Sequence, residues 1–135
     1  NSADKKYLSR VTSNNSKFKI LIVEDDVVNR KILVSQLTTA KYNVVAVVNG
    51  EDALKLINSD TTIDIVLLDI MLPDMSGWDI FEKLKTSSRK FAFLSAIPIS
   101  KERMRELKKA GVSDYITKPF TKADLIKRVG KLLKS

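Results

Sequence analysis

The chain has 135 residues and a formal net charge of +8, and it contains neither cysteine nor histidine. This length suffices for one domain with a hydrophobic core, and nothing in the sequence indicates a second domain. The composition excludes disulfide bonds, thiolate chemistry, an imidazole base and an ordinary zinc site. Any chemistry therefore depends on carboxylates, hydroxyls, lysines and a hard cation.

No segment approaches the roughly 18 apolar residues that a membrane-spanning helix requires, and the N-terminal part lacks the apolar segment of a signal peptide. We therefore expect a cytoplasmic domain without membrane contact, which can also be the cytoplasmic part of a larger, membrane-anchored protein. The net charge is +4 in residues 1–19, −3 in residues 20–100 and +7 in residues 101–135. The basic last third indicates either an ordinary lysine-rich surface or a surface for an acidic partner.

Residues 1–17 are rich in Ser, Asn and Lys and cannot build much of a core, so we predict a flexible linker there and one domain over residues 18–135. From Phe18 onward, short apolar runs alternate with amphipathic segments, which predicts a βα unit repeated five times. The expected strands cover residues 20–23, 44–48, 63–68, 91–94 and 115–116. The third is almost wholly apolar, as expected of a central parallel strand with helices on both faces.

The first expected helix covers residues 27–39, and we predict one apolar stripe on it. The members of that stripe are Val28, Ile32, Leu33 and Leu37. Asn49-Gly50 then predicts a turn before the second helix. The third helix follows Gly77.

Ser100 is a predicted N-cap of the fourth helix, and Gly111 is predicted to take the left-handed conformation after its end. Thr121 and Asp124 resemble a capping box that opens the last helix, although Asp replaces the usual Glu or Gln. The inward side chains expected on that helix are Leu125, Ile126, Val129, Leu132 and Leu133.

Polar residues follow four of the expected strands. Glu24-Asp25 follows the first strand, Asp69 the third, Ser95 the fourth, and Lys118 lies after the fifth. If the strands are parallel, these groups converge at one edge of the sheet, where open α/β folds bind their ligands. Three carboxylates in one place repel one another unless a cation such as Mg²⁺ binds them. The pattern therefore favours a site for a metal ion and a phosphoryl group.

The same segments resemble the receiver domain of two-component response regulators, and the resemblance extends from about Phe18 to Leu133. The segments that carry it are residues 20–26, Asp69 to Gly77 (DIMLPDMSG), Ser95-Ala96 and Lys118-Pro119-Phe120. The resemblance implies an α/β, flavodoxin-like fold with a doubly wound parallel sheet of strand order 2-1-3-4-5. In that order the first and third strands flank the switch point of the sheet.

By resemblance, Asp69 is the phosphoacceptor, and Mg²⁺, or Mn²⁺ in its place, is the cofactor. Asp25 and Asp69 would be direct metal ligands, Glu24 a ligand largely through water, and the backbone carbonyl of Met71 a further ligand. The Met71 side chain takes no part in this assignment. Asp26 lies outside the matched pair, and we interpret it as a charge at the start of a helix.

Three further groups would stabilise the transferred phosphoryl group. They are the Lys118 ammonium, the Ser95 hydroxyl and the backbone N–H of Ala96. The family pattern also implies a cis bond between Lys118 and Pro119. Phosphorylation would draw Ser95 inward and let the ring of Tyr115 follow, which makes these two residues the expected switch.

The expected phosphodonor is a phosphohistidine of a histidine kinase or of a histidine-containing phosphotransfer protein. The domain itself would be no enzyme, although it would assist its own Mg²⁺-dependent phosphorylation. Its dephosphorylation is expected to be slow, because Met71 and Ile97 are bulky and apolar at positions that border the path of the hydrolytic water. The readout surface would be the fourth helix, fifth strand and fifth helix, which is also a candidate surface for a homodimer.

Three other functions remain open from the sequence. The chain can be a pseudo-receiver that acts as an interaction module with a silent site. A hydrolytic phosphatase with Asp69 as nucleophile would need a second acid, and Met71 cannot serve as one. Nucleic-acid binding through the basic last third is disfavoured, because no recognisable DNA-reading motif is present there.

Overall fold

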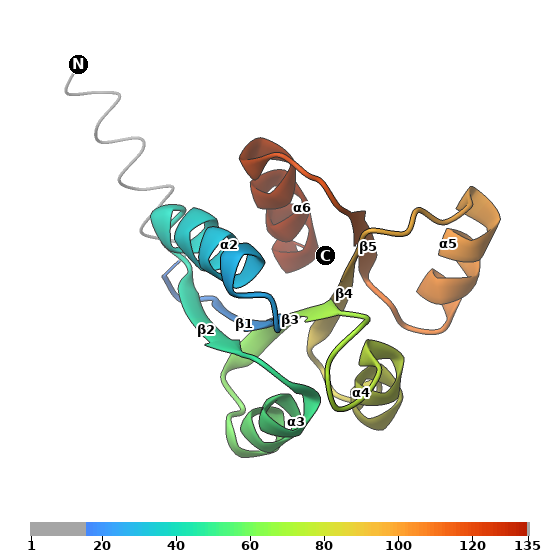
Figure 1. Cartoon of the computed structure of the whole chain (residues 1–135), viewed down its shortest axis with the longest axis horizontal. Helices are drawn as coiled ribbons and strands as arrows, with labels where there is room; N and C mark the ends of the chain where they lie inside the picture. Colours follow the sequence, from blue (N-terminus) through green and yellow to red (C-terminus); the bar gives the residue numbers. More distant parts are fainter. Residues whose placement is uncertain (1–15, 135) are drawn as a thin grey trace.

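A computed structural model describes residues 16–134 of the chain (Figure 1). The predicted linker over residues 1–17 lies outside the described residues except for its last two positions. No helix among the described residues is long and apolar enough to cross a membrane.

Five strands form one parallel sheet in the order β2-β1-β3-β4-β5. They are β1 (Lys19–Val23), β2 (Asn43–Val47), β3 (Ile63–Asp69), β4 (Lys90–Ser95) and β5 (Asp114–Thr117). This order confirms the predicted flavodoxin-like fold with β3 at the centre. Each observed strand lies within two residues of its predicted bounds, and Asp69 is the last residue of β3 rather than the first residue after it.

Five helices cover the two faces of the sheet. They are α2 (Val27–Thr39), α3 (Gly50–Ser59), α4 (Gly77–Leu84), α5 (Lys101–Lys109) and α6 (Lys122–Lys134). Helices α2 and α6 lie on one face, and α3, α4 and α5 lie on the other (Figure 1). All the β-α-β connections are therefore long crossovers of the kind that parallel neighbours require.

The core consists of two apolar layers, one on each face of the sheet. Successive side chains of a strand point to opposite faces, so Ile20 and Ile22 pack with α2 and α6, whereas Leu21 and Val23 pack with the helices of the other face. All four side chains are fully buried. The continuous apolar runs of the sequence thus result from burial on both sides of the sheet.

The predicted apolar stripe of α2 is partly wrong. Leu33 and Leu37 are buried, but Val28 is 64% exposed and Ile32 is 46% exposed. Consecutive residues of a helix are about 100° apart around its axis. Ile32 therefore lies well to the side of Leu33, and the sheet and α6 cover only the side that carries Leu33 and Leu37.

Several local signals act as predicted. The Ser100 hydroxyl caps α5 by accepting from the backbone N–H of Arg103, and Gly111 has a φ of 107°, in the left-handed region. Asp26 is the N-cap of α2, where its carboxylate accepts from the N–H of Asn29. Asn49 differs from prediction, because it is the N-cap of α3 rather than part of a separate turn.

The start of α6 contains half of the predicted capping box. The Thr121 hydroxyl accepts from the N–H of Asp124 at 3.0 Å. The carboxylate of Asp124 instead forms an ion pair with Arg128, one turn further along α6. A shorter Asp in place of Glu or Gln is suited to this i,i+4 pair.

Candidate functional site

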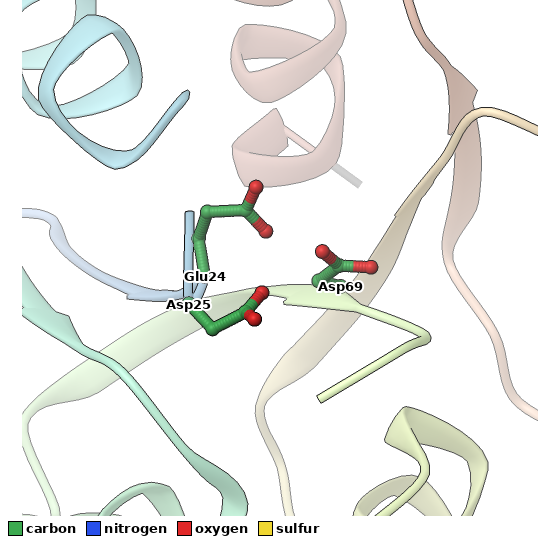
Figure 2. A group of neighbouring side chains, drawn as sticks. All are labelled: Glu24, Asp25 and Asp69. Atoms are coloured by element: carbon green, nitrogen blue, oxygen red, sulfur yellow. The ribbon is translucent and has the colours of Figure 1, made fainter. Parts of the chain in front are cut away.

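Three carboxylates meet where β1 and β3 end. Glu24 and Asp25 directly follow β1, and Asp69 ends β3, its neighbour in the sheet. One carboxylate oxygen of each residue lies within 4.8 Å of the other two. Figure 2 shows the three side chains pointing towards one another. The predicted convergence of these side chains is therefore present in the folded chain.

Glu24 is the buried member of this carboxylate cluster, with 1% of its surface exposed. Burial, followed by the hydrogen bond and negative charge of Asp69, raises the pKa of Glu24 to about 7. Its Oε2 atom is buried and has no hydrogen-bond partner among residues 16–134. A buried carboxylate oxygen without a partner is costly. An all-oxygen donor set with such an atom fits a hard divalent cation such as Mg²⁺.

The side chain of Lys118 reaches the carboxylate cluster from the end of β5. Its ammonium lies 3.3 Å from Oε1 of Glu24 and 3.6 Å from Oδ2 of Asp69. The backbone N–H of Lys118 donates to the carbonyl of Ser95 at 2.7 Å, which joins the ends of β4 and β5. The Lys118-Pro119 bond is cis, as the family resemblance implied. One ammonium offsets only part of the charge of three carboxylates.

The loop after Asp69 is held close to the Asp69 carboxylate. Oδ1 of Asp69 accepts from the N–H of Met71 at 3.0 Å, and the N–H of Gly77 donates to the carbonyl of Ile70 at 2.7 Å. A Cβ atom on Gly77 would lie 2.5 Å from the Asp69 carbonyl oxygen, so the start of α4 requires glycine here. The Met71 side chain is exposed.

Ser95 and Tyr115 meet at the loop that follows β4. The Ser95 hydroxyl accepts from the N–H of Ile97 at 3.1 Å, and the Tyr115 hydroxyl donates to the Ile97 carbonyl at 2.6 Å. Both side chains are buried. Among the described residues, no hydrogen bond joins Ser95 to Asp69. The two expected switch residues therefore contact the same residue, Ile97, one through its N–H and the other through its carbonyl, and Ser95 is not hydrogen-bonded to Asp69 in this structure.

Ala96 is exposed beside this loop and lines a cavity of about 380 Å³. Lys118, Pro119 and Phe120 form one wall of that cavity. The opposite wall comes from α2, with Asn29, Ile32, Leu33 and Gln36. A groove thus runs beside the carboxylate cluster, between α2 and the connection from β5 to α6.

Two residues of the site were not predicted from the sequence. Arg30 donates from its guanidinium to the carbonyl oxygens of Glu24 and Asp25, at 3.1 Å each, and so holds the backbone of the acidic pair. The only sequence signal for this contact is a cation on the first turns of the helix that follows the acids.

Asp74 is the second such residue. Its carboxylate accepts from the N–H groups of Gly50 and Glu51 at 2.8 and 2.9 Å, and these hydrogen bonds lower the pKa of Asp74. The loop after Asp69 is thereby fastened to the N-terminus of α3. The Met75 side chain lies where a Cβ atom on Gly50 would be, so the two segments pack closely.

Comparison with known proteins agrees with this geometry. The family model of the response regulator receiver domain matches residues 20–130. The chain belongs to this family. As expected for a receiver domain, its fold is shared with solved structures of other members. The match to the receiver domain of Francisella response regulator 1452 has a TM-score of 0.77 and 30% sequence identity. It covers 86% of this chain and 96% of the Francisella chain. The match to the beryllofluoride-activated receiver domain of DrrB has a TM-score of 0.72 and 31% sequence identity. It covers 87% of this chain and 98% of the DrrB chain.

Two relatives of this receiver domain are longer proteins that match it over part of their length. The probable transcriptional regulatory protein SilR of Salmonella typhimurium is 39% identical over 118 residues, which cover 86% of this chain and 51% of SilR. The hybrid signal transduction histidine kinase L of Dictyostelium discoideum is 34% identical over 124 residues, which cover 84% of this chain but only 7% of the kinase. The chain thus spans about half the length of SilR and a small part of the kinase.

Proposed function

We propose that this receiver domain accepts a phosphoryl group on Asp69 from a phosphohistidine, in a Mg²⁺-dependent reaction. The observation that carries the proposal is the cluster of Glu24, Asp25 and Asp69 with the Lys118 ammonium beside it. Such an arrangement supplies a nucleophile, oxygen ligands and a fixed positive charge within one small volume. Phosphoryl transfer needs little else from a protein.

In the transfer, an Asp69 carboxylate oxygen forms a bond to phosphorus while the bond between phosphorus and the donor's imidazole nitrogen breaks. The electron pair of that bond stays on the imidazole, and the product on Asp69 is a mixed carboxylic-phosphoric anhydride. Lys118 would neutralise charge on the phosphoryl oxygens, and the Ala96 N–H and Ser95 hydroxyl would donate hydrogen bonds to them. The same groups would assist autophosphorylation from small donors, and hydrolysis of the anhydride would be slow.

Mg²⁺ would be held by the carboxylates of Glu24, Asp25 and Asp69 and by the Met71 carbonyl, with Mn²⁺ as a substitute. When bound, the ion would supply positive charge to the phosphoryl oxygens. The buried, unpartnered oxygen of Glu24 supports this assignment. Arg30 would keep the two acids of β1 in position through their backbone carbonyls.

The donor protein, a histidine kinase or a histidine-containing phosphotransfer protein, would dock on the rim of the site. Exposed apolar side chains surround that rim: Val27, Val28, Ile32, Met71 and Ile97. Such a group of exposed apolar residues is typical of a protein interaction surface. The groove between α2 and Phe120 adjoins it and would receive part of the donor.

Phosphorylation would be transmitted through the loop that contains Ile97. A Ser95 hydroxyl that turned to the phosphoryl group would give up its hydrogen bond with the Ile97 N–H, while Tyr115 holds the carbonyl of the same residue. The loop leads directly into α5, so we propose α5, β5 and α6 as the readout surface. Two packings of this loop would then exchange population on phosphorylation.

The test is the intact mass of the protein after incubation with acetyl phosphate or beryllofluoride, with and without Mg²⁺. We expect one Mg²⁺-dependent adduct that is absent from Asp69→Asn. Asp26→Asn is the matched control, because Asp26 is close in sequence but caps α2 outside the carboxylate cluster, and Asn caps a helix as well as Asp does. A folded protein that forms no adduct would instead be the pseudo-receiver.

A further inference from the structure

Most basic residues of the last third of the chain lie on α5 and α6. Residues 101–135 carry eleven basic and four acidic side chains. On α5, every basic side chain is exposed, and Leu107 is the one buried residue. The basic residues of α5 are Lys101, Arg103, Arg105, Lys108 and Lys109. This face is unlike the carboxylate site, where the fold concentrates negative charge.

A cleft of about 470 Å³ lies on this face, and we call it the lysine cleft. It is lined by Lys108, Ser113, Asp114, Asp124, Lys127, Arg128, Lys131 and Leu132. Lys127 and Lys131 lie one turn apart on α6, and Lys108 comes from the end of α5. The cleft is therefore bordered by cations that belong to two different helices.

The acidic residues of the lysine cleft are already paired with Arg128. Its guanidinium lies 3.1 Å from a carboxylate oxygen of Asp114 and 3.3 Å from one of Asp124. Among residues 16–134, Lys108, Lys127 and Lys131 form no ion pair, and all three are exposed. Three cations of the cleft are thus available to a ligand with negative charge.

The same charges disfavour a homodimer through this face. A two-fold symmetric dimer through this face would bring two copies of the same patch together, and each patch carries more basic than acidic side chains. Like charges that meet at an interface are unfavourable. The single apolar residue of the cleft, Leu132, is buried within its own chain, so the cleft offers no apolar centre for a dimer to bury.

We propose that the lysine cleft binds an acidic segment of a partner protein, whose carboxylates would contact Lys108, Lys127 and Lys131. The i,i+4 spacing of Lys127 and Lys131 suits two carboxylates that are roughly 5–6 Å apart, as on one face of a helix. Asp114 and Asp124, paired with Arg128, interrupt the basic surface of the cleft, so it lacks the continuous basic track that a nucleic-acid backbone requires. None of the cleft residues belongs to the carboxylate cluster, so the unphosphorylated chain already presents all three lysines to such a segment.

The experiment is a titration of the isotope-labelled full chain with a deca-glutamate peptide, followed by amide chemical shifts at low salt. We expect shifts centred on residues 108, 113–114 and 127–132, and an affinity that falls as salt is added. Lys127→Gln/Lys131→Gln should weaken binding about fivefold, as expected for two ion pairs at a surface. Asp69→Asn should bind the peptide as the unmodified chain does, which separates this test from that of the proposed function.

Lys31→Gln/Lys83→Gln is the matched control, because it removes the same charge from exposed positions on α2 and α4. Binding in this control should change less than about twofold. An equal loss in both double variants would overturn the proposal, because net charge alone would then explain the binding. Tighter binding of a single-stranded decanucleotide than of the peptide would also overturn it. A homodimer of the unmodified chain in analytical sedimentation, disrupted by Lys127→Gln/Lys131→Gln, would overturn it too.

Discussion

The Lys118 ammonium lies 3.3 Å from the Glu24 carboxylate, and the two residues are 94 positions apart in the chain. Glu24 follows β1 and Lys118 follows β5, so this ion pair extends over the ends of β3 and β4. Its geometry links the acidic half of the site to the last strand of the sheet. The pair does not satisfy Glu24, whose second oxygen lacks a partner among the described residues.

The raised pKa of Glu24 predicts that the metal-free protein loses stability as the pH rises. The pKa is about 7 in the folded chain against an ordinary value of 4.5. Between these two values the folded state binds the proton more strongly than the unfolded state, so the free energy of unfolding decreases with increasing pH across this window. Above pH 7 Glu24 is ionised in both states, so the folded chain carries the full cost of a buried carboxylate.

Glu24→Gln removes this titration. In EDTA we compare the free energy of unfolding of Glu24→Gln with that of the unmodified chain. We expect the difference to shift in favour of the variant by about 2 kcal/mol between pH 5 and pH 8. Urea unfolding at several pH values between 5 and 8 measures the difference. A difference that stays the same at every pH would show that Glu24 is ionised throughout.

Mg²⁺ is expected to stabilise the folded chain, because it would relieve the repulsion among Glu24, Asp25 and Asp69. A saturating concentration should add about 1–3 kcal/mol to the free energy of unfolding. Asp25→Asn should lose most of this gain, whereas Asp26→Asn should keep it. Thermal unfolding with MgCl₂ or EDTA is the measurement. Full retention of the Mg²⁺ effect in Asp25→Asn would exclude Asp25 as a ligand.

Gly77→Ala and Gly130→Ala are expected to have opposite effects. A Cβ atom on Gly77 would lie 2.5 Å from the backbone oxygen of Asp69, so this change should cost about 2 kcal/mol or more and weaken Mg²⁺ binding. A Cβ atom on Gly130 meets nothing within 4 Å inside α6, so Ala there should gain up to about 1 kcal/mol. Chemical denaturation of both variants tests the pair. Equal stabilities would contradict the close approach of α4 to Asp69.

Asp74→Ala is expected to loosen the loop that carries Met71. The change removes the acceptors for the N–H groups of Gly50 and Glu51 and should lower the free energy of unfolding, as the loss of a helix cap does. Mg²⁺ affinity should also fall, because the Met71 carbonyl would lose its support. Calorimetric titration with MgCl₂ measures the affinity. If stability falls while affinity is unchanged, Asp74 serves the fold alone.

Tyr115→Phe is expected to keep the packing of the ring but to release the Ile97 carbonyl. Loss of the 2.6 Å hydrogen bond should cost about 1 kcal/mol. Amide exchange at residues 96–99 should become faster, while exchange in β4 is unchanged. Ser113→Ala is a useful control, since its hydroxyl contacts the other end of β4 through Phe91. Unaltered exchange at 96–99 would mean that Tyr115 does not restrain this loop.

Much of the site followed from local sequence because each key residue ends a strand. The apolar runs before Glu24 and Asp69 identify buried parallel strands, and parallel strands bring their carboxyl ends to one edge. Ser100, Gly111 and Asp26 acted as predicted because capping depends on a few neighbouring residues. Asn49 caps α3 although Asn-Gly also favours a turn, because Asn is common at both places.

Other features were decided by tertiary structure alone. The exposure of Val28 and Ile32 depends on how much of α2 the sheet and α6 cover, and the helical pattern cannot show this. The hydrogen bonds of Asp74 join the loop after β3 to the start of α3, whose distance in space the sequence does not specify. The Arg30 contact is local, but the direction of its guanidinium depends on the path of the backbone after β1. The sequence by itself therefore determined the order of the elements, the fold and the residues at the strand ends. Only the tertiary structure decided which oxygen of Glu24 is unpaired and which lysines of α5 and α6 form no ion pair within residues 16–134, because both depend on distances between side chains of different elements.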